Sequence, residues 1–102
     1  MSIVVPYRVK SGVIHRLTMI RDLEQLPAQP GVYGIFASPE VRGGQPIPLH
    51  WAEARKDFLT EVHEDPGVHK ASARGGAYMG ILIVPAELAR RRILNELRAA
   101  YP

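Results

Sequence analysis

The fold is decided by one short stretch, Val32-Tyr33-Gly34-Ile35-Phe36-Ala37, which is rich in residues that favour β-structure. Pro27 and Pro30 stiffen the chain before it, and a segment with three prolines and two glycines, residues 38–48, comes after it. Such a segment is typical of a loop. The sequence therefore predicts a central strand over 31–37 that runs into a loop over 38–48.

The chain upstream of this strand predicts a β-hairpin. Residues 3–9 and 13–17 are rich in β-branched and aromatic side chains, and Ser11-Gly12 between them suits a turn. Pro6 has no N–H to donate within a sheet, which places the first strand at an edge. Residues 21–26 predict a single helical turn.

Two helices and one strand are predicted downstream. The apolar spacing over 51–64 follows one face of a helix, which Pro66-Gly67 then ends. The run 77–84 is apolar throughout, as in a strand covered on both faces. Pro85 suits the first position of a closing helix, whose apolar stripe extends to residue 100.

Together these segments predict one α+β domain over 1–102, with a small, mainly antiparallel sheet flanked by two or three helices. Residues 1–25 form an N-terminal extension with the hairpin, and 26–102 form the core. A chain of 102 residues has room for one such core. The hairpin and the apolar run also predict a two-fold homodimer that hides apolar surface; the alternative is that the hairpin covers its own chain's sheet.

Composition narrows the class of protein. The chain has no cysteine, which excludes disulfides, thiolate zinc sites and cysteine nucleophiles, and fits the cytoplasm. No apolar run approaches the roughly 20 residues of a membrane-spanning helix, so no membrane partner is expected. The formal net charge is +3, with five acids gathered over 53–65 and many of the bases after them. We therefore expect an acidic and a basic region on the surface.

One motif carries a family resemblance. The segment Leu26-Pro27-Ala28-Gln29-Pro30-Gly31-Val32-Tyr33-Gly34-Ile35 resembles the opening of the GIY-YIG nuclease family, in which Leu-Pro and a short gap precede Pro-Gly-Val/Ile-Tyr in a strand. The loop, helix, strand and closing helix that follow are similar in order, and the closing helix ends in Tyr101-Pro102, like the family's terminal pattern. The resemblance covers about residues 26–102 and implies the family's fold.

The resemblance also implies where catalytic groups belong. It assigns activation of water to tyrosines, a phosphate clamp to an arginine and a divalent cation to a glutamate. Tyr33 matches the first tyrosine, and by position His50 replaces the second. No arginine occurs over 58–63, where the clamp is expected. Leu94 stands at the glutamate position, and Glu96 is the nearest carboxylate.

These departures favour a GIY-YIG-like domain with a degenerate active site, which is not an enzyme and binds nucleic acid or a protein. Glu53, Asp57 and Glu61 repeat every four residues, so they would line one face of the predicted helix and repel a phosphate. This acidic face argues against phosphodiester cleavage.

The alternative is a metal-dependent endonuclease with a site rebuilt from Tyr33, His50 and Glu96, in which Glu96 holds Mg²⁺ or Mn²⁺. Each residue also has a structural interpretation. A tyrosine in a central strand commonly packs with its hydroxyl hydrogen-bonded, and a histidine at a strand end is commonly structural. No cofactor is expected unless the site is active.

Candidate nucleic-acid contacts lie late in the chain. Lys70 and Arg74 belong to a predicted basic loop, and the closing helix adds Arg90, Arg91 and Arg98. The ordinary alternative for this helix is a solvated face whose arginines pair with Glu87 and Glu96 three or four residues away.

Overall fold

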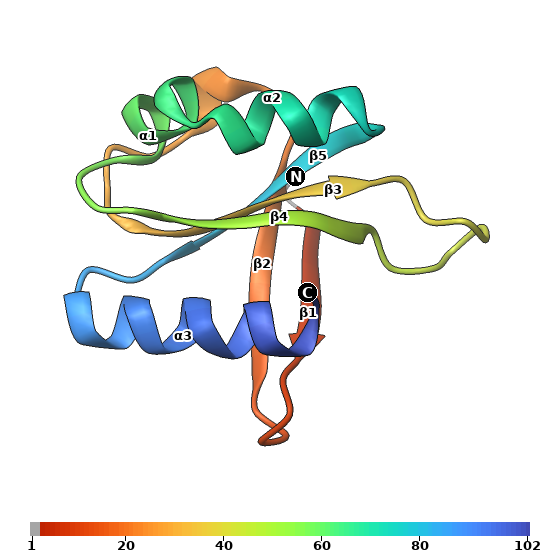
Figure 1. Ribbon diagram of the computed structural model, residues 1–102, viewed down its shortest axis with the longest axis horizontal. Helices are drawn as coiled ribbons and strands as arrows, with labels where there is room; N and C mark the ends of the chain where they lie inside the picture. Colours follow the sequence, from red (N-terminus) through yellow and green to blue (C-terminus); the bar gives the residue numbers. More distant parts are fainter. Residues whose placement is uncertain (1–2) are drawn as a thin grey trace.

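The computed structural model describes residues 3–102, which form a five-stranded sheet with helices on both faces (Figure 1). Every strand pairing is antiparallel, in the order β1-β2-β5-β3-β4, so the predicted α+β class is confirmed. The elements are, in chain order, β1 (Ile3–Arg8), β2 (Ile14–Ile20), the short 3₁₀ turn η1 (Leu23–Gln25), β3 (Gly31–Ala37), β4 (Ile47–Ala54), α1 (Phe58–Glu64), α2 (Pro66–Ala73), β5 (Gly76–Ile83) and α3 (Glu87–Ala100).

The central position of β3 is the predicted one. This strand pairs with β4 on one side and with β5 on the other, and its first six residues are buried. Gly31 is required there, because a Cβ atom would overlap the Leu82 carbonyl of β5 and the Phe58 ring of α1. The glycine therefore lets strand and helix approach closely at the start of β3.

Two apolar clusters lie on opposite faces of the sheet. Figure 1 shows α3 on one face and α1 with α2 on the other. Under α3, the predicted stripe of the helix supplies Ile93, Leu94 and Leu97, which pack with Phe36 and Trp51 of the sheet. The cluster under α1 and α2 contains, among others, Tyr33, Ile35, Ala54, Phe58, Val62, Ala71, Met79 and Ile81.

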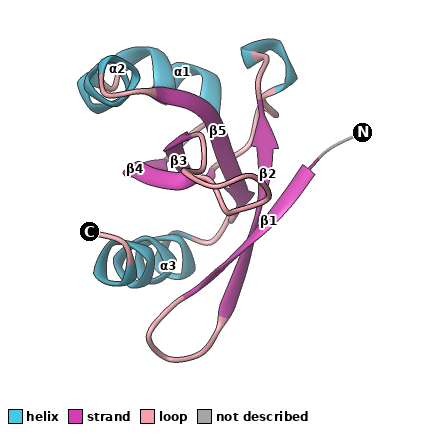
Figure 2. Cartoon of the chain, turned by 90° about the vertical axis from the view of Figure 1, so that its right-hand side faces the viewer, coloured by secondary structure: helices cyan, strands magenta, loops and turns pink. Residues whose placement is uncertain are grey.

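The predicted N-terminal hairpin exists, and its second strand extends to Ile20. β2 meets β5 over residues 18–20 only, so much of the hairpin continues past the sheet toward the C-terminal end of α3 (Figures 1 and 2). Its inner residues Tyr7, Val9 and Leu17 are buried in the cluster under α3. The hairpin thus covers the core of its own chain, which was the alternative to a dimer.

The predicted helix over 51–64 is wrong in its first half. Residues 51–54 complete β4, and α1 begins only after Asp57, whose side chain accepts the Thr60 N–H at 2.8 Å as an N-cap. The spacing of Trp51 and Ala54 fits one face of a helix, and it also fits a strand that is buried on both faces. Pairing with β3 makes this segment a strand. The loop predicted over 38–48 is correspondingly shorter, since β4 starts at Ile47.

The helix boundaries near the prolines also differ from the predictions. The predicted helix does end before Pro66-Gly67, since α1 stops at Glu64, but a second helix that was not predicted, α2, begins at Pro66. Pro85 precedes α3 and its N-cap, Ala86, instead of opening the helix. Within residues 3–102, no helix combines the length and the apolar content needed to cross a membrane.

Candidate functional site

Two of the three predicted catalytic residues, Tyr33 and His50, converge on Asp65, a residue that was not among the predicted ones. The Tyr33 hydroxyl on β3 donates to Asp65 Oδ2 at 2.6 Å, and His50 Nε2 on β4 lies 2.7 Å from the same oxygen. Adjacent strands bring the two rings to the same face of the sheet, with centroids 6.4 Å apart. The result is a carboxylate held from both sides, at the corner between α1 and α2.

Asp65 owes its position to the two helices that it joins. It is the last cap of α1 and the N-cap of α2, and its Oδ1 accepts the Gly67 N–H at 2.8 Å. Burial by itself would raise the pKa of Asp65, but the hydrogen bonds from Tyr33, His50 and Gly67 outweigh it and lower the pKa. The carboxylate is therefore charged at neutral pH and acts only as an acceptor.

The hydrogen bond from the Tyr33 hydroxyl to Asp65 determines what chemistry Tyr33 can perform. Its side chain is 1% exposed, and burial, together with the hydrogen bond to Asp65, raises the pKa of the phenol far above its usual range. A tyrosine must lose its proton to act as a base, and this proton points at a carboxylate. The geometry makes Tyr33 a hydrogen-bond donor that fixes the α1–α2 corner on the sheet.

Glu96 does not join Tyr33 and His50. It lies on α3, on the opposite face of the sheet, with Oε2 at 3.8 Å from His15 Nε2 and Oε1 at 3.7 Å from Arg92 Nε. It therefore cannot hold a cation against the other two residues in this fold, and the implied metal does not fit the predicted set. Among residues 3–102, no group of three metal-ligating side chains comes together.

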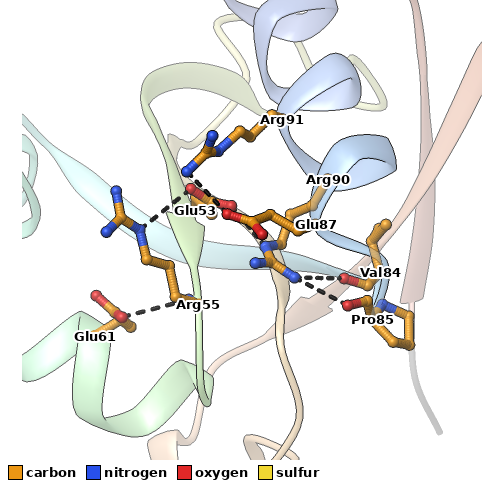
Figure 3. A network of polar contacts seen from close by, with 8 residues as sticks. All are labelled: Glu53, Arg55, Glu61, Val84, Pro85, Glu87, Arg90 and Arg91. Atoms are coloured by element: carbon orange, nitrogen blue, oxygen red, sulfur yellow. Dashed lines mark hydrogen bonds and ion pairs between the residues drawn. The ribbon is translucent and has the colours of Figure 1, made fainter.

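The predicted acidic helix face is also absent. Glu53 is on β4, Asp57 caps α1 and only Glu61 lies within that helix. Figure 3 shows Glu53 turned toward α3, where Arg90 Nε donates to Oε2 at 2.7 Å, with Arg55 Nε 3.6 Å from the other oxygen. The repulsion expected from three aligned carboxylates therefore has no basis in the structure.

The predicted nucleic-acid contacts fall into two groups. Lys70 and Arg74, on α2 and its C-cap, are exposed. The arginines of α3 are engaged: Arg90 is 5% exposed and bonded to Glu53 and to the carbonyls of Val84 and Pro85, Arg91 pairs with Glu87 at 2.9 Å, and Arg98 donates to the Trp51 carbonyl at 3.0 Å. The ordinary alternative, pairing with Glu87 or Glu96, holds for Arg91 and Arg92, whereas Arg90 and Arg98 have other partners.

Sequence reasoning missed Asp65, although a local signal was present. An aspartate followed by proline is a typical helix start, with the acid as N-cap and the proline at the first helical position. Reading Asp65-Pro66 as the start of α2 would have indicated a helical corner here. The local signal does not predict the contact between Asp65 and Tyr33, because 32 residues separate the two in the chain.

Neither family models, nor curated proteins, nor solved structures gave a match to this chain.

Proposed function

We propose that this chain is a nucleic-acid-binding module that has the scaffold of the GIY-YIG nuclease family and lacks its cleavage chemistry. One observation carries the absence of cleavage: the hydroxyl of Tyr33, the residue expected to activate water, donates its proton to Asp65 within the core. His50 is committed to the same carboxylate. Both groups that remain of the implied site thus serve to anchor the helices.

The charge of the chain supports nucleic acid as the ligand. Its formal net charge is +3 and its sequence pI is about 9.6. A module of this kind binds phosphates through lysine and arginine, which releases counterions and makes the affinity fall steeply with salt. If the chain does not bind nucleic acid, or binds it with an affinity that barely depends on salt, we infer that its ligand is a protein. The cytoplasm is the proposed compartment, because the sequence has no cysteine to oxidise.

The test combines cleavage and binding in the same preparation. Supercoiled plasmid is incubated with the protein and Mg²⁺ or Mn²⁺, and retention of a labelled DNA duplex is measured at low salt. We expect bound, intact plasmid with either metal. Metal-dependent nicking that disappears in Tyr33→Phe, with the fold intact by circular dichroism, would overturn the proposal in favour of a rebuilt nuclease.

The rebuilt nuclease remains a second candidate because Tyr33 and His50 do lie together. Such a site would have to work with Asp65 in place of Glu96. His50→Ala separates the two functions: it should leave DNA binding unchanged in a binding module, and it should abolish nicking in a nuclease.

A further inference from the structure

The N-terminal hairpin carries positive charge and no negative charge. Residues 1–21 include Arg8, Lys10, Arg16 and Arg21, and the first acidic residue of the chain is Asp22. All four side chains are exposed, and Arg21 lies over the Tyr78 ring, 5.1 Å from its centroid. The charged side chains of the hairpin are thus all positive, whereas the chain as a whole carries both signs of charge.

In the described part of the chain, Arg8, Lys10 and Arg16 also differ from the arginines at 90–92 of α3 in forming no ion pair. Within residues 3–102, no ion pair involves Arg8, Lys10 or Arg16. On α3, by contrast, three successive arginines each pair with a glutamate: Arg90 with Glu53, Arg91 with Glu87 and Arg92 with Glu96. The charge available to an external anion is therefore greater on the hairpin than on the helix.

The pleat of the hairpin puts its arginines on one face. Along β1 the side chains alternate, with Tyr7 buried and Pro6 and Arg8 exposed. Pro6 lies opposite Arg16, so Arg8 and Arg16 are diagonal neighbours on the exposed face, roughly 7–8 Å apart. We call this surface the hairpin outer face; it comprises Val4, Pro6, Arg8, Ile14, Arg16 and Thr18, with Lys10 at the turn.

The shape of the hairpin suits a groove. Figures 1 and 2 show its turn extending past α3, clear of the other elements. Two paired strands are about 4.8 Å apart, and the major groove of B-DNA, about 12 Å wide and 8.5 Å deep, admits a two-stranded ribbon. Tyr7 and Leu17 on the inner face are fully buried, so the ribbon is held in place before it binds.

We infer that the hairpin outer face is a docking surface for duplex DNA, which it enters through the major groove with Arg8, Lys10 and Arg16 against the phosphates. The inference rests on the proposed nucleic-acid-binding function and assigns it to the N-terminal extension in place of α3, whose successive arginines are paired with glutamates. Val4, which is 51% exposed on the same face, adds an apolar contact of the kind made with thymine methyl groups.

The test uses charge-matched variants of the full chain and a labelled DNA duplex of mixed sequence. Arg8→Gln/Lys10→Gln/Arg16→Gln and the control Arg42→Gln/Lys56→Gln/Arg92→Gln each remove three positive charges, taking the formal net charge from +3 to zero. Affinity is read from fluorescence anisotropy between about 50 and about 200 mM salt. Circular dichroism checks that both variants fold.

We expect the hairpin variant to lose about tenfold or more in affinity, and its salt dependence, d log K/d log [salt], to become shallower by about 2–3. The control should stay within about threefold of the parent in affinity at low salt, because its cations lie elsewhere. Arg8→Lys/Arg16→Lys keeps the charge and should keep the binding. An equal loss in hairpin variant and control would mean that net charge alone decides, and would overturn the inference.

Further arms separate the inference from the function on which it rests. A parent chain that binds no DNA at low salt refutes both; a parent that binds as well as its hairpin variant refutes the inference alone. Loss in Lys70→Gln/Arg74→Gln/Arg91→Gln with an unaffected hairpin variant returns the site to α2 and α3. Equal affinity for duplex RNA, whose major groove is too narrow for a ribbon, or binding to phosphatidylserine vesicles without DNA binding, also overturns it.

Discussion

A single carboxylate joins four elements of this protein. Asp65 ends α1, caps α2 and receives hydrogen bonds from β3 and β4. Gly67 allows the arrangement, because a Cβ atom at that position would overlap the His50 ring. Tyr33 and His50, which stand at the positions that the family resemblance assigns to activation of water, therefore position a helical corner.

Asp65→Asn should lower the free energy of unfolding by about 2 kcal/mol at pH 7, because hydrogen bonds to a charged acceptor are among the strongest. The pKa of Asp65 is lowered in the folded state, so this stability is fully present above the ordinary aspartate pKa of about 3.9 and is lost as the pH falls through the folded-state value. Urea unfolding at neutral and acidic pH should show the difference between parent and variant shrinking below about pH 4.

Glu64→Gln provides the control for this measurement. Glu64 is the neighbouring acid, exposed at the end of α1. Its substitution should change stability little at any pH. A stability difference for Asp65→Asn that stays constant down to pH 3 would contradict the role of a charged carboxylate.

At the scale of the elements, an ion pair ties α3 to the edge strand β4. Arg90 and Glu53 are 5% and 11% exposed at the side chain, and Arg90 Nη1 also donates to the Pro85 carbonyl at 3.1 Å (Figure 3). The same helix carries Arg91, whose partner Glu87 is exposed. Successive arginines on one helix therefore have different roles, one in the core and one in solvent.

Arg90→Leu should destabilise the protein by about 3 kcal/mol or more, because it leaves the largely buried Glu53 without its main partner. Arg91→Leu removes an exposed pair and should cost less than about 1 kcal/mol. Chemical unfolding of the two variants, measured side by side, gives both values. Adding Glu53→Leu to Arg90→Leu should restore part of the loss; equal effects of the two single substitutions would refute the buried pair.

At the scale of the whole molecule, the β1 edge of the sheet is shielded. Gln45 Nε2 donates to the Pro6 carbonyl at 2.6 Å and the Tyr101 hydroxyl donates to the Arg8 carbonyl at 2.8 Å. These carbonyls point away from β2, and Pro6 has no N–H to offer beside them. Measurement of the mass in solution tests the predicted homodimer. The covered β1 edge does not favour a dimer formed by pairing of two β1 strands.

Removal of this shield should promote association through strand pairing. Pro6→Val restores an outward N–H and Gln45→Ala frees the Pro6 carbonyl, so the double variant should show a larger dimer fraction than the parent in sedimentation velocity. Glu40→Ala, in the same loop as Gln45, leaves the edge covered and should match the parent. An unchanged distribution in the double variant would show that these groups do not protect the edge.

The sequence alone determined the parts of the fold that depend on local pattern. Continuous β-formers predicted β3 and β5, the turn Ser11-Gly12 predicted the hairpin, and the apolar stripe of α3 predicted its buried face. Each of these signals lies within one element, where period and propensity act directly. The pairing of Tyr33 with a hydrogen-bond partner was likewise predicted from its residue type.

Only the tertiary structure decided the rest, because the deciding contacts join residues distant in the chain. Trp51 and Ala54 fit a helix by spacing, and pairing with β3 made them a strand. Glu53 pairs with Arg90, which is 37 residues away in the chain. This pair takes Glu53 out of the predicted acidic helix face and Arg90 out of the predicted nucleic-acid surface. Tyr33 and Glu96 are separated because Tyr33 projects from one face of the sheet and Glu96 lies on α3, which packs on the other face. A linear sequence does not state on which face of a sheet a helix will pack.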